Sequence, residues 1–508
     1  MPSLTRTIAA AIGGMSAIVA ALQLRPAPTP AVSPFDRPTA EIWPAVATWS
    51  PTLEDEYAAF VARLGDAVEA RTCRGLQGCL RDPAANLLWD GSDATLDIVV
   101  DCADLPYLLR AYFAFKRRLP FGFVSAVDGA AGRDIRYTRD VHPVAWKTWR
   151  DFPTPRDLFE HMVNYVHSGM FRTAPTVEDA DFYPVAVDRR AIRPGAIFYD
   201  PNGHVLVVAR RTASGAIYLL DGHPDGTLTW TRFGEALALG GADQGGGFRA
   251  FRPLLLAGDA LVRTPNAGLP LYDPDAQHDR ARWQVDGTAV GYHAWIRGTV
   301  ADDPDADPVD GLRDEIRALC RDVGERLDAV DLALAGGLAD QPHPPDLPEN
   351  IYGTDGDWEL YSTPSRDARL KAAVRETANA LAALPDREAH VDALAAAWRE
   401  EVARPACRFA YYDSRGLPVA FTIETVIDRL FELSFDPYHC PELRWGAPAG
   451  SAELASCPDD ADKRAWYARE QRLRNQIDRD YGAPTPLDRG PLERPAIDPR
   501  RWLIGEVR

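Results

Sequence analysis

The stretch LDIVVDCADLPYLLRAYF, residues 96–113, decides how this chain is expected to fold. It opens with a short apolar run that ends at Asp101, and from Leu105 onward apolar side chains recur at helical spacing. Pro106 fits this pattern only in the first turn of a helix, because proline lacks the N–H that an interior position needs. The sequence therefore predicts a helix whose N-terminus carries Asp101 and Cys102.

A second pattern lies in PGAIFYDPNGHVLVVA, residues 194–209. Two short apolar runs rich in β-forming residues follow the Pro-Gly pair, and His204 opens the second of them. A third run at residues 216–220 ends at Asp221. The spacing predicts an antiparallel sheet in which His204 and Asp221 lie on neighbouring strands.

These residue types are the ones that acyl transfer by a thiol requires. A thiol attacks as its thiolate, and the free amides at a helix start are expected to lower the pKa of Cys102 and later to hold an oxyanion. His204 is placed to take the thiol proton and return it to the leaving group. Asp221 is placed to fix the tautomer of His204. The predicted catalytic set is Cys102, His204 and Asp221.

Together these segments resemble the NlpC/P60 cysteine hydrolases and the related CHAP amidases. The likeness covers residues 97–256 and rests on Asp-Cys at a helix start, Pro-Gly-Ala-Ile-Phe, Gly-His-Val-Leu-Val-Val and a polar residue on the next strand. It implies an α+β fold with a papain-like core, in which the nucleophile helix packs on an antiparallel sheet. It also implies hydrolysis of amide or peptide bonds, usually in bacterial cell-wall peptides, with no cofactor.

The chain departs from the family pattern in three places. The family usually continues Asp-Cys with Ser-Gly, whereas Ala103 and Asp104 follow here. The distance along the chain from Cys102 to His204 is long for the family, so residues 121–190 are interpreted as an insertion. The third residue is often histidine, and here His223 competes with Asp221 for that role.

Three further residues are candidates for binding substrate. Asp101, Asp104 and His223 all lie next to a predicted catalytic residue in the sequence. The two aspartates equally fit helix caps, because aspartate is a favoured residue at a helix N-terminus. His223 follows an Asp-Gly pair, which is also an ordinary turn signal.

Cysteine usage points to an oxidising compartment. The chain has seven cysteines, and an odd number leaves one thiol unpaired when the others form disulfides. The alternative is that all seven are reduced. In the oxidised interpretation Cys102 is the thiol left over. The candidate disulfides join Cys73 to Cys79, Cys440 to Cys457, and Cys320 to Cys407.

The N-terminus is typical of an export signal. Residues 1–6 carry one positive charge, residues 7–24 are apolar and rich in alanine, and residues 25–38 are rich in proline. An uncleaved membrane anchor is the alternative, because the apolar run is almost long enough to span a bilayer. The sequence predicts a protein of the periplasm or the cell exterior, possessing no later membrane span.

Length and charge set the remaining limits. A chain of 508 residues is too long for one ordinary core. The net charge of −18 argues against nucleic acid and anionic membrane surfaces as default partners. A peptide or cell-wall peptide substrate is the partner that the resemblance implies. Neither the oligomeric state nor the role of the C-terminal half is predicted. The expected organisation is a signal and tether (1–40), a helical segment (41–95), the catalytic domain (96–257) and a mainly helical region (258–508).

Three other functions stay open at this stage. A transglutaminase-like acyltransferase would use the same residues, with an amine in place of water. A non-catalytic binding protein on the same fold would have an unreactive Cys102. A metal-dependent enzyme would use His204, Asp221 and His223, although no second ligand pair at zinc spacing accompanies them.

Overall fold

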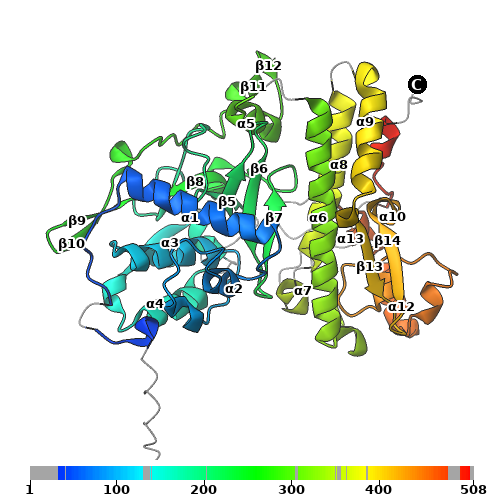
Figure 1. The fold of residues 1–508 in the computed structure, drawn as a ribbon, viewed down its shortest axis with the longest axis horizontal. Coiled ribbons are helices and arrows are strands. Elements are labelled where there is room, and N and C mark those ends of the chain that lie inside the picture. Colours follow the sequence, from blue (N-terminus) through cyan, green and yellow to red (C-terminus); the bar gives the residue numbers. More distant parts are fainter. Residues whose placement is uncertain are drawn as a thin grey trace, which may run out of the picture.

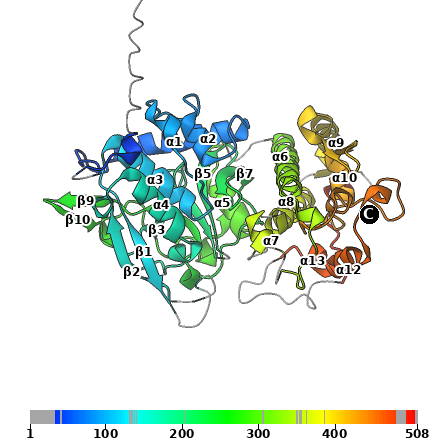
Figure 2. The same cartoon turned by 90° about the horizontal axis from the view of Figure 1, so that it is seen from below.

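The computed structural model describes residues 33–503 apart from 40–41, 130–134, 136–137, 139, 202, 304–306, 349–350, 352–355, 362, 385–386 and 479–491. These residues form two lobes that lie side by side (Figures 1 and 2). We call residues 33–300 the sheet lobe and residues 307–503 the helical lobe. The expected signal and anchor at residues 1–32 lie outside the described residues. No helix in the described part of the chain is long and apolar enough to cross a membrane.

The sheet lobe is built on a six-stranded antiparallel sheet with the strand order β3-β8-β4-β5-β6-β7. The three runs expected from the sequence are β4, β5 and β6, and their predicted pairing is confirmed. Leu206 on β5 faces Asp221 on β6, and His204 pairs with Asp200 at the end of the β4–β5 hairpin. The strands are β3 (Phe182–Pro184), β4 (Ile197–Asp200), β5 (His204–Arg211), β6 (Ile217–Gly222), β7 (Leu228–Arg232) and β8 (Gly247–Phe251).

Two helices cover one face of this sheet. They are α1 (Pro51–Glu69) and α3 (Asp104–Arg117), which lie in one layer in Figure 1. Both pack against Val205 and Val207 of β5 in the main core. The Ser50 side chain accepts the Leu53 N–H at the start of α1, which satisfies one of the free donors of the first turn. The expected nucleophile helix therefore exists and packs on an antiparallel sheet.

The opposite face of the sheet is covered by residues beyond the expected domain boundary at 257. Leu206 and Leu219 pack there against Trp295 and Ile296 of α5 (Tyr292–Val300). The apolar run at residues 248–256 divides between two elements. Its first part is β8, which inserts between β3 and β4, and its second part forms a separate hairpin.

The remaining elements of the sheet lobe lie around this core. The segment expected as an insertion, residues 121–190, contains a two-stranded hairpin and α4 in addition to β3. These outer elements are α2 (Leu76–Arg81), β1 (Gly122–Asp128), β2 (His142–Thr148), α4 (Pro155–Tyr165), β9 (Leu254–Ala257), β10 (Ala260–Arg263), β11 (Gln284–Val285) and β12 (Thr288–Ala289).

The helical lobe is mainly helical, as predicted. Its long helices α6 (Pro308–Ala335), α8 (Thr363–Ala383) and α9 (Arg387–Val402) run alongside one another in Figure 1. Arg326 of α6 is buried and donates to both carboxylate oxygens of Asp367 on α8, at 2.5 and 3.1 Å. The shorter elements are α7 (Gly356–Leu360), β13 (Arg408–Tyr412), β14 (Pro418–Thr422), α10 (Ile423–Asp428), α11 (Pro441–Arg444), α12 (Ala461–Arg469) and α13 (Gln471–Asn475).

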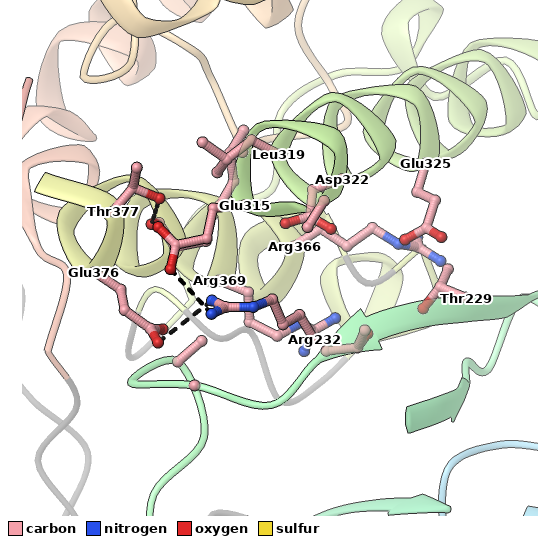
Figure 3. Close-up of a pocket in the computed structure, with 16 residues that line it drawn as sticks. Thr229, Arg232, Glu315, Leu319, Asp322, Glu325, Arg366, Arg369, Glu376 and Thr377 are labelled. Atoms are coloured by element: carbon pink, nitrogen blue, oxygen red, sulfur yellow. Dashed lines mark hydrogen bonds and ion pairs between the residues drawn. The ribbon is translucent and has the colours of Figure 1, made fainter. Parts of the chain in front are cut away.

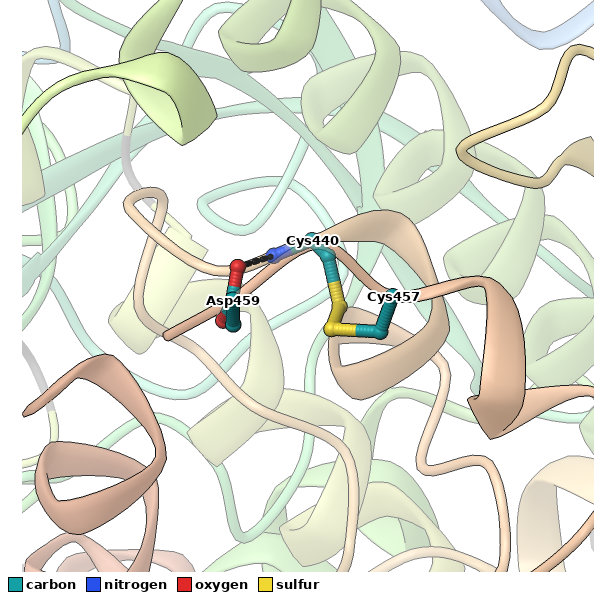
Figure 4. A group of neighbouring side chains, drawn as sticks. All are labelled: Cys440, Cys457 and Asp459. Atoms are coloured by element: carbon teal, nitrogen blue, oxygen red, sulfur yellow. Dashed lines mark hydrogen bonds between the residues drawn. A yellow bond between two sulfur atoms is a disulfide. The ribbon is translucent and has the colours of Figure 1, made fainter. Parts of the chain in front are cut away.

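Three disulfides join six of the seven cysteines in the pairs expected from the sequence. They are Cys73–Cys79, Cys320–Cys407 and Cys440–Cys457, and Figure 4 shows the last of them. Cys102 is the free cysteine. Disulfides persist in oxidising compartments, so the pairing supports an exported location.

The two lobes meet along the free edge of the sheet. The strand β7 is an edge strand, and α6 lies beside it. The Trp230 N–H on β7 donates to Glu325 of α6 at 2.9 Å, which satisfies a donor that an edge strand leaves without a partner. Arg232 of β7 also forms an ion pair with Glu315 of α6, at 3.1 Å.

Candidate active site

The turn that carries Cys102 is held in place by its own aspartate. Asp101 Oδ1 accepts the N–H groups of Ala103 at 2.8 Å and Asp104 at 3.0 Å, so Asp101 caps the start of α3. A Cβ atom on Gly222 would lie 2.6 Å from the Asp101 carbonyl oxygen. Glycine at this position therefore allows the turn that carries Cys102 to approach the end of β6.

The thiol of Cys102 lies against the backbone on both sides of His204. Its Sγ atom is 3.8 Å from the Gly203 carbonyl oxygen, and the Val205 N–H donates a hydrogen bond to the sulfur. Cys102 is half-buried. The predicted nucleophile and the predicted base thus lie at neighbouring points of the fold, although they are far apart in the sequence.

His204 and Asp221 are in direct contact. The Nε2 atom of His204 lies 2.9 Å from Oδ1 of Asp221, whose side chain is fully buried. Burial alone would raise the pKa of Asp221, but His204, His223 and Arg369 outweigh it and hold that pKa below its usual range. Asp221 is therefore ionised at neutral pH. Because Nε2 faces Asp221, Nδ1 is the ring nitrogen that is left to exchange a proton with the thiol.

The structure brings the thiol near His204 without a hydrogen bond to its ring. Side chains alternate along a strand, so His204 shares a sheet face with Leu206, and α3 packs on the opposite face against Val205. Among the described residues, the contacts of Cys102 Sγ are with backbone groups. The His204–Asp221 pair is formed in this state, and a thiol–imidazole contact requires the ring to turn.

The pKa of the thiol moves in the direction opposite to the one expected from its helix position. Burial raises the pKa of Cys102 well above its usual value, and the carboxylates of Asp101, Asp221 and Asp104 raise it further. The Val205 N–H acts in the other direction but does not outweigh them. The expectation of a lowered pKa is therefore wrong for this state, and the thiol is protonated.

Two of the three residues predicted to bind substrate are buried against protein groups. Asp104 is 3% exposed, and its carboxylate accepts the Asp101 N–H at 3.3 Å. Burial and the charge of Asp101 raise the pKa of Asp104 to about 9, so it is protonated at neutral pH. His223 is 1% exposed, and its Nε2 lies 2.8 Å from the Thr229 hydroxyl and 3.5 Å from Asp221.

Burial, assisted by a neighbouring charge, keeps His223 neutral. Burial and the nearby Arg366 lower the pKa of His223 to about 3, and Asp221 and Asp225 do not reverse the shift. Asp104 therefore contacts the turn that carries Cys102, and His223 contacts Asp221. Asp101 caps the helix.

Sequence patterns did not indicate Arg369, which reaches the site from α8 of the helical lobe. Its Nη1 lies 3.5 Å from Nε2 of His204, and its Nη2 lies 3.5 Å from Oδ2 of Asp221. The side chain is 12% exposed. No local motif in α8 marks this arginine, because its relation to the site arises only when the two lobes pack together. A residue of the helical lobe is therefore part of the candidate active site.

Comparison with protein-family models, with curated proteins and with solved structures finds no match for this chain. The function must be argued from the site. The likeness to NlpC/P60 enzymes rests on the quoted residues alone.

Two groups of side chains in the helical lobe have the spacing of metal ligands. Cys440, Cys457 and Asp459 form one group, but the two sulfur atoms are joined in a disulfide and Asp459 accepts the Cys440 N–H at 3.2 Å (Figure 4). Disulfide sulfur is not the thiolate that metal binding requires. Nothing in the first group therefore favours a metal ion.

The second group consists of His343, Asp436 and Glu470. The Nε2 atom of His343 lies 2.6 Å from Asp436, while Glu470 accepts hydrogen bonds from Ser434 at 2.8 Å and Arg474 at 3.0 Å. Since protein groups already occupy these donors and acceptors, we interpret the cluster as a buried ion network.

A buried histidine completes that network. His439 lies between Asp459 and Glu470, with 2.7 Å from a ring nitrogen to each carboxylate. Burial would lower the pKa of His439, but Glu470 and Asp459 outweigh it and raise the pKa to about 10. His439 is therefore a buried cation whose charge is matched by two carboxylates.

Proposed function

We propose that this chain is an exported cysteine hydrolase that cleaves amide or peptide bonds, with cell-wall peptides as its substrate class, on a papain-like core. One observation carries the proposal. The single free thiol lies at the start of α3 against the backbone that flanks His204, and His204 is bound to the buried, ionised Asp221. This juxtaposition supplies a nucleophile, a base and a group that orients the base.

In the proposed reaction the thiol loses its proton as it attacks. The His204 ring turns so that Nδ1 takes the proton from Cys102, while Asp221 stabilises the imidazolium that forms. Sγ attacks the scissile carbonyl carbon, and the Cys102 N–H donates to the resulting oxyanion. Collapse of this intermediate breaks the C–N bond, and the leaving amine takes the proton from His204.

Water completes the cycle. His204 removes a proton from a water molecule, whose oxygen attacks the thioester carbonyl carbon. The C–S bond then breaks, the acid product leaves, and the proton returns to Sγ of Cys102. No group outside the chain is consumed except substrate and water.

A non-catalytic binding protein on the same fold is the second candidate. It is favoured by the raised pKa of the Cys102 thiol and by the backbone partners of its sulfur, which are the surroundings of an inert cysteine. The two functions differ in whether a bound peptide is turned over.

The test is to incubate the non-reduced chain with peptides released from bacterial cell walls and to identify products by mass spectrometry. The hydrolase predicts new amide cleavage that disappears in Cys102→Ala and falls at least about a thousandfold in His204→Gln. His142→Gln, which alters an exposed histidine of the sheet lobe, is the matched control and should keep full activity.

Two other outcomes separate the alternatives. Products that carry an added amine in place of water would show an acyltransferase. Binding of the peptides without cleavage, equal in the unaltered chain and in Cys102→Ala, would contradict the hydrolase and support the binding protein.

A further inference from the structure

A pocket lies between the edge strand β7 and helices α6 and α8 (Figure 3). Both lobes contribute to its lining. Thr229 comes from the sheet lobe, whereas Asp322 and Glu325 come from α6 and Arg366 and Arg369 come from α8. The pocket is thus a product of lobe packing and is distinct from the turn that carries the thiol.

Each arginine of this pocket already has an acidic partner. Arg232 lies 3.1 Å from Glu315 and 3.4 Å from Glu376, and Figure 3 shows both contacts. Arg366 lies 3.2 Å from Asp225. Arg369 is 3.5 Å from Asp221, as described above. The positive charges of the lining are therefore balanced.

Two acids of the pocket, Asp322 and Glu325, have no ion-pair partner of this kind among the described residues. Asp322 and Glu325 lie three residues apart on α6, so both carboxyl groups lie on one helix face. Neither forms an ion pair with any described residue, and the described partner of Glu325 is the Trp230 N–H. Burial raises the pKa of Asp322 to about 7 although Arg321, Arg369 and Arg232 oppose it. Burial and Asp322 raise the pKa of Glu325 to about 8.

A donor without a partner lies in the same lining. The Arg366 side chain is 7% exposed, and its terminal nitrogens donate to Asp225, Thr227 and the Tyr361 carbonyl. Its Nε atom has no hydrogen-bond partner among the described residues. A buried donor without a partner costs free energy, which an acceptor on a bound molecule would recover.

We propose that this pocket binds the unblocked amino end of an amino acid or peptide. Asp322 and Glu325 receive the ammonium group, and Arg366 Nε donates to the carbonyl or carboxylate oxygen next to it. The ammonium group supplies a direct ion-pair partner, which neither carboxylate has among the described residues. The adjacent oxygen accepts the Arg366 Nε–H. The amino end of one molecule therefore supplies both an ion-pair partner for the two acids and an acceptor for this donor.

Two residues that line the pocket also contact residues of the candidate active site. Arg369 lines it and touches both His204 and Asp221. Thr229 lines it as well and contacts His223, which lies 3.5 Å from Asp221. A bound amino end would therefore be held next to the groups that set the charge of Asp221. That link rests on the proposed function, whereas binding in the pocket does not.

The test is calorimetric titration of the full, non-reduced chain with three probes: L-alanyl-L-alanine, its N-acetylated form and free L-alanine. Titration of Cys102→Ala in parallel separates binding from turnover. We expect the unblocked dipeptide to bind at least about tenfold more tightly than the acetylated one, because the acetyl group removes the charge. Binding of alanine as tight as that of the dipeptide would identify an amino-acid site, and weaker binding would identify a peptide site.

The variants locate the binding. Asp322→Asn combined with Glu325→Gln should lower affinity for the dipeptide at least about tenfold, since both side chains keep their shape and lose their charge. Asp314→Asn, on the same helix and paired with Arg317, should leave affinity unchanged. Equal binding of the acetylated probe, unchanged affinity in the double variant, or no binding of the unblocked dipeptide at millimolar concentration would each overturn the proposal. Circular dichroism confirms that the variants fold.

Discussion

The two lobes hold their charged groups in different ways. In the sheet lobe the charged residues of the site lie on short local motifs, and a single buried carboxylate, Asp221, is shared by His204, His223 and Arg369. In the helical lobe the buried charges form closed networks, such as His439 with Asp459 and Glu470. The site in the sheet lobe thus centres on one shared carboxylate, whereas in this network of the helical lobe two carboxylates match one buried histidine cation. Arg369 of the helical lobe reaches this carboxylate of the sheet lobe.

Removal of a disulfide should have the largest effect on stability. Because each lobe contains a disulfide, the same change can be compared between the two lobes. Cys320–Cys407 in the helical lobe closes a loop with a sequence separation of 87, against 6 for Cys73–Cys79 in the sheet lobe. Replacing both Cys320 and Cys407 with serine should lower the free energy of unfolding by about 4 kcal/mol, because a long loop loses more entropy on closure. Urea denaturation measures the change. The matched control replaces Cys73 and Cys79, and a larger cost for that pair would contradict the account.

Removal of the buried cation should have the next largest effect. His439→Gln leaves Asp459 and Glu470 without their positive partner, and we expect a loss of about 3 kcal/mol in urea denaturation at pH 6. The pKa of His439 is raised in the fold, so its contribution is complete below pH 6.5 and disappears as the pH rises through about 10. His390→Gln, on α9, is the control. A variant as stable as the unaltered chain would show that the network is not required.

A smaller effect of opposite sign is expected in the sheet lobe. The pKa of Asp104 is raised to about 9, so its stabilising contribution falls as the pH rises from about 4 toward 9. Asp104→Asn resembles the protonated form and should raise the free energy of unfolding at pH 8 by about 1–2 kcal/mol. The gain should vanish near pH 4, where the carboxyl is protonated in both states. A destabilised variant at pH 8 would show that the turn that carries Cys102 is stabilised by the ionised form of Asp104.

Replacement of Arg369 should have the smallest effect of the four. It tests directly whether the helical lobe contributes to the candidate active site in the sheet lobe. The Arg369 guanidinium lies 3.5 Å from Nε2 of His204 and 3.5 Å from Oδ2 of Asp221. Arg369→Gln removes a positive charge from beside this pair, so the pH profile of activity should move by about half to one pH unit. Arg375→Gln on the same helix, paired with Asp478, should leave the profile unchanged. An unchanged pH profile in Arg369→Gln would show that the helical lobe takes no part in the candidate active site.

The sequence predicts elements that depend on a local pattern better than contacts between segments that lie far apart in the chain. The helix after Cys102 and the strands that carry His204 and Asp221 follow from local periodicity and from Pro106, and the structure confirms them. The edge strand β7 is not among the strands expected from the sequence, although its residues LTWTR alternate apolar and polar side chains and a Pro-Asp-Gly turn at residues 224–226 separates it from β6. Its contact with α6 depends on segments far apart in the chain.

The electrostatics of the site required the structure. A helix start lowers the pKa of a thiol only when its amides dominate, and here burial and three carboxylates dominate instead. The burial of Asp104 and His223 and the arrival of Arg369 likewise depend on contacts between segments far apart in the sequence. Residue spacing therefore predicts the contact between His204 and Asp221, but it predicts neither the approach of Arg369 nor the protonation states of these groups.

The most direct test of the central claim is the alkylation rate of Cys102 by iodoacetamide at pH 7 in the non-reduced chain, with the adduct located by mass spectrometry. The account predicts one adduct, on Cys102, formed at least about tenfold more slowly in His204→Gln than in the unaltered chain, because the protonated thiol depends on that base. His142→Gln should react at the unaltered rate. Equal rates in the unaltered chain and in His204→Gln would contradict the claim that His204 acts on Cys102.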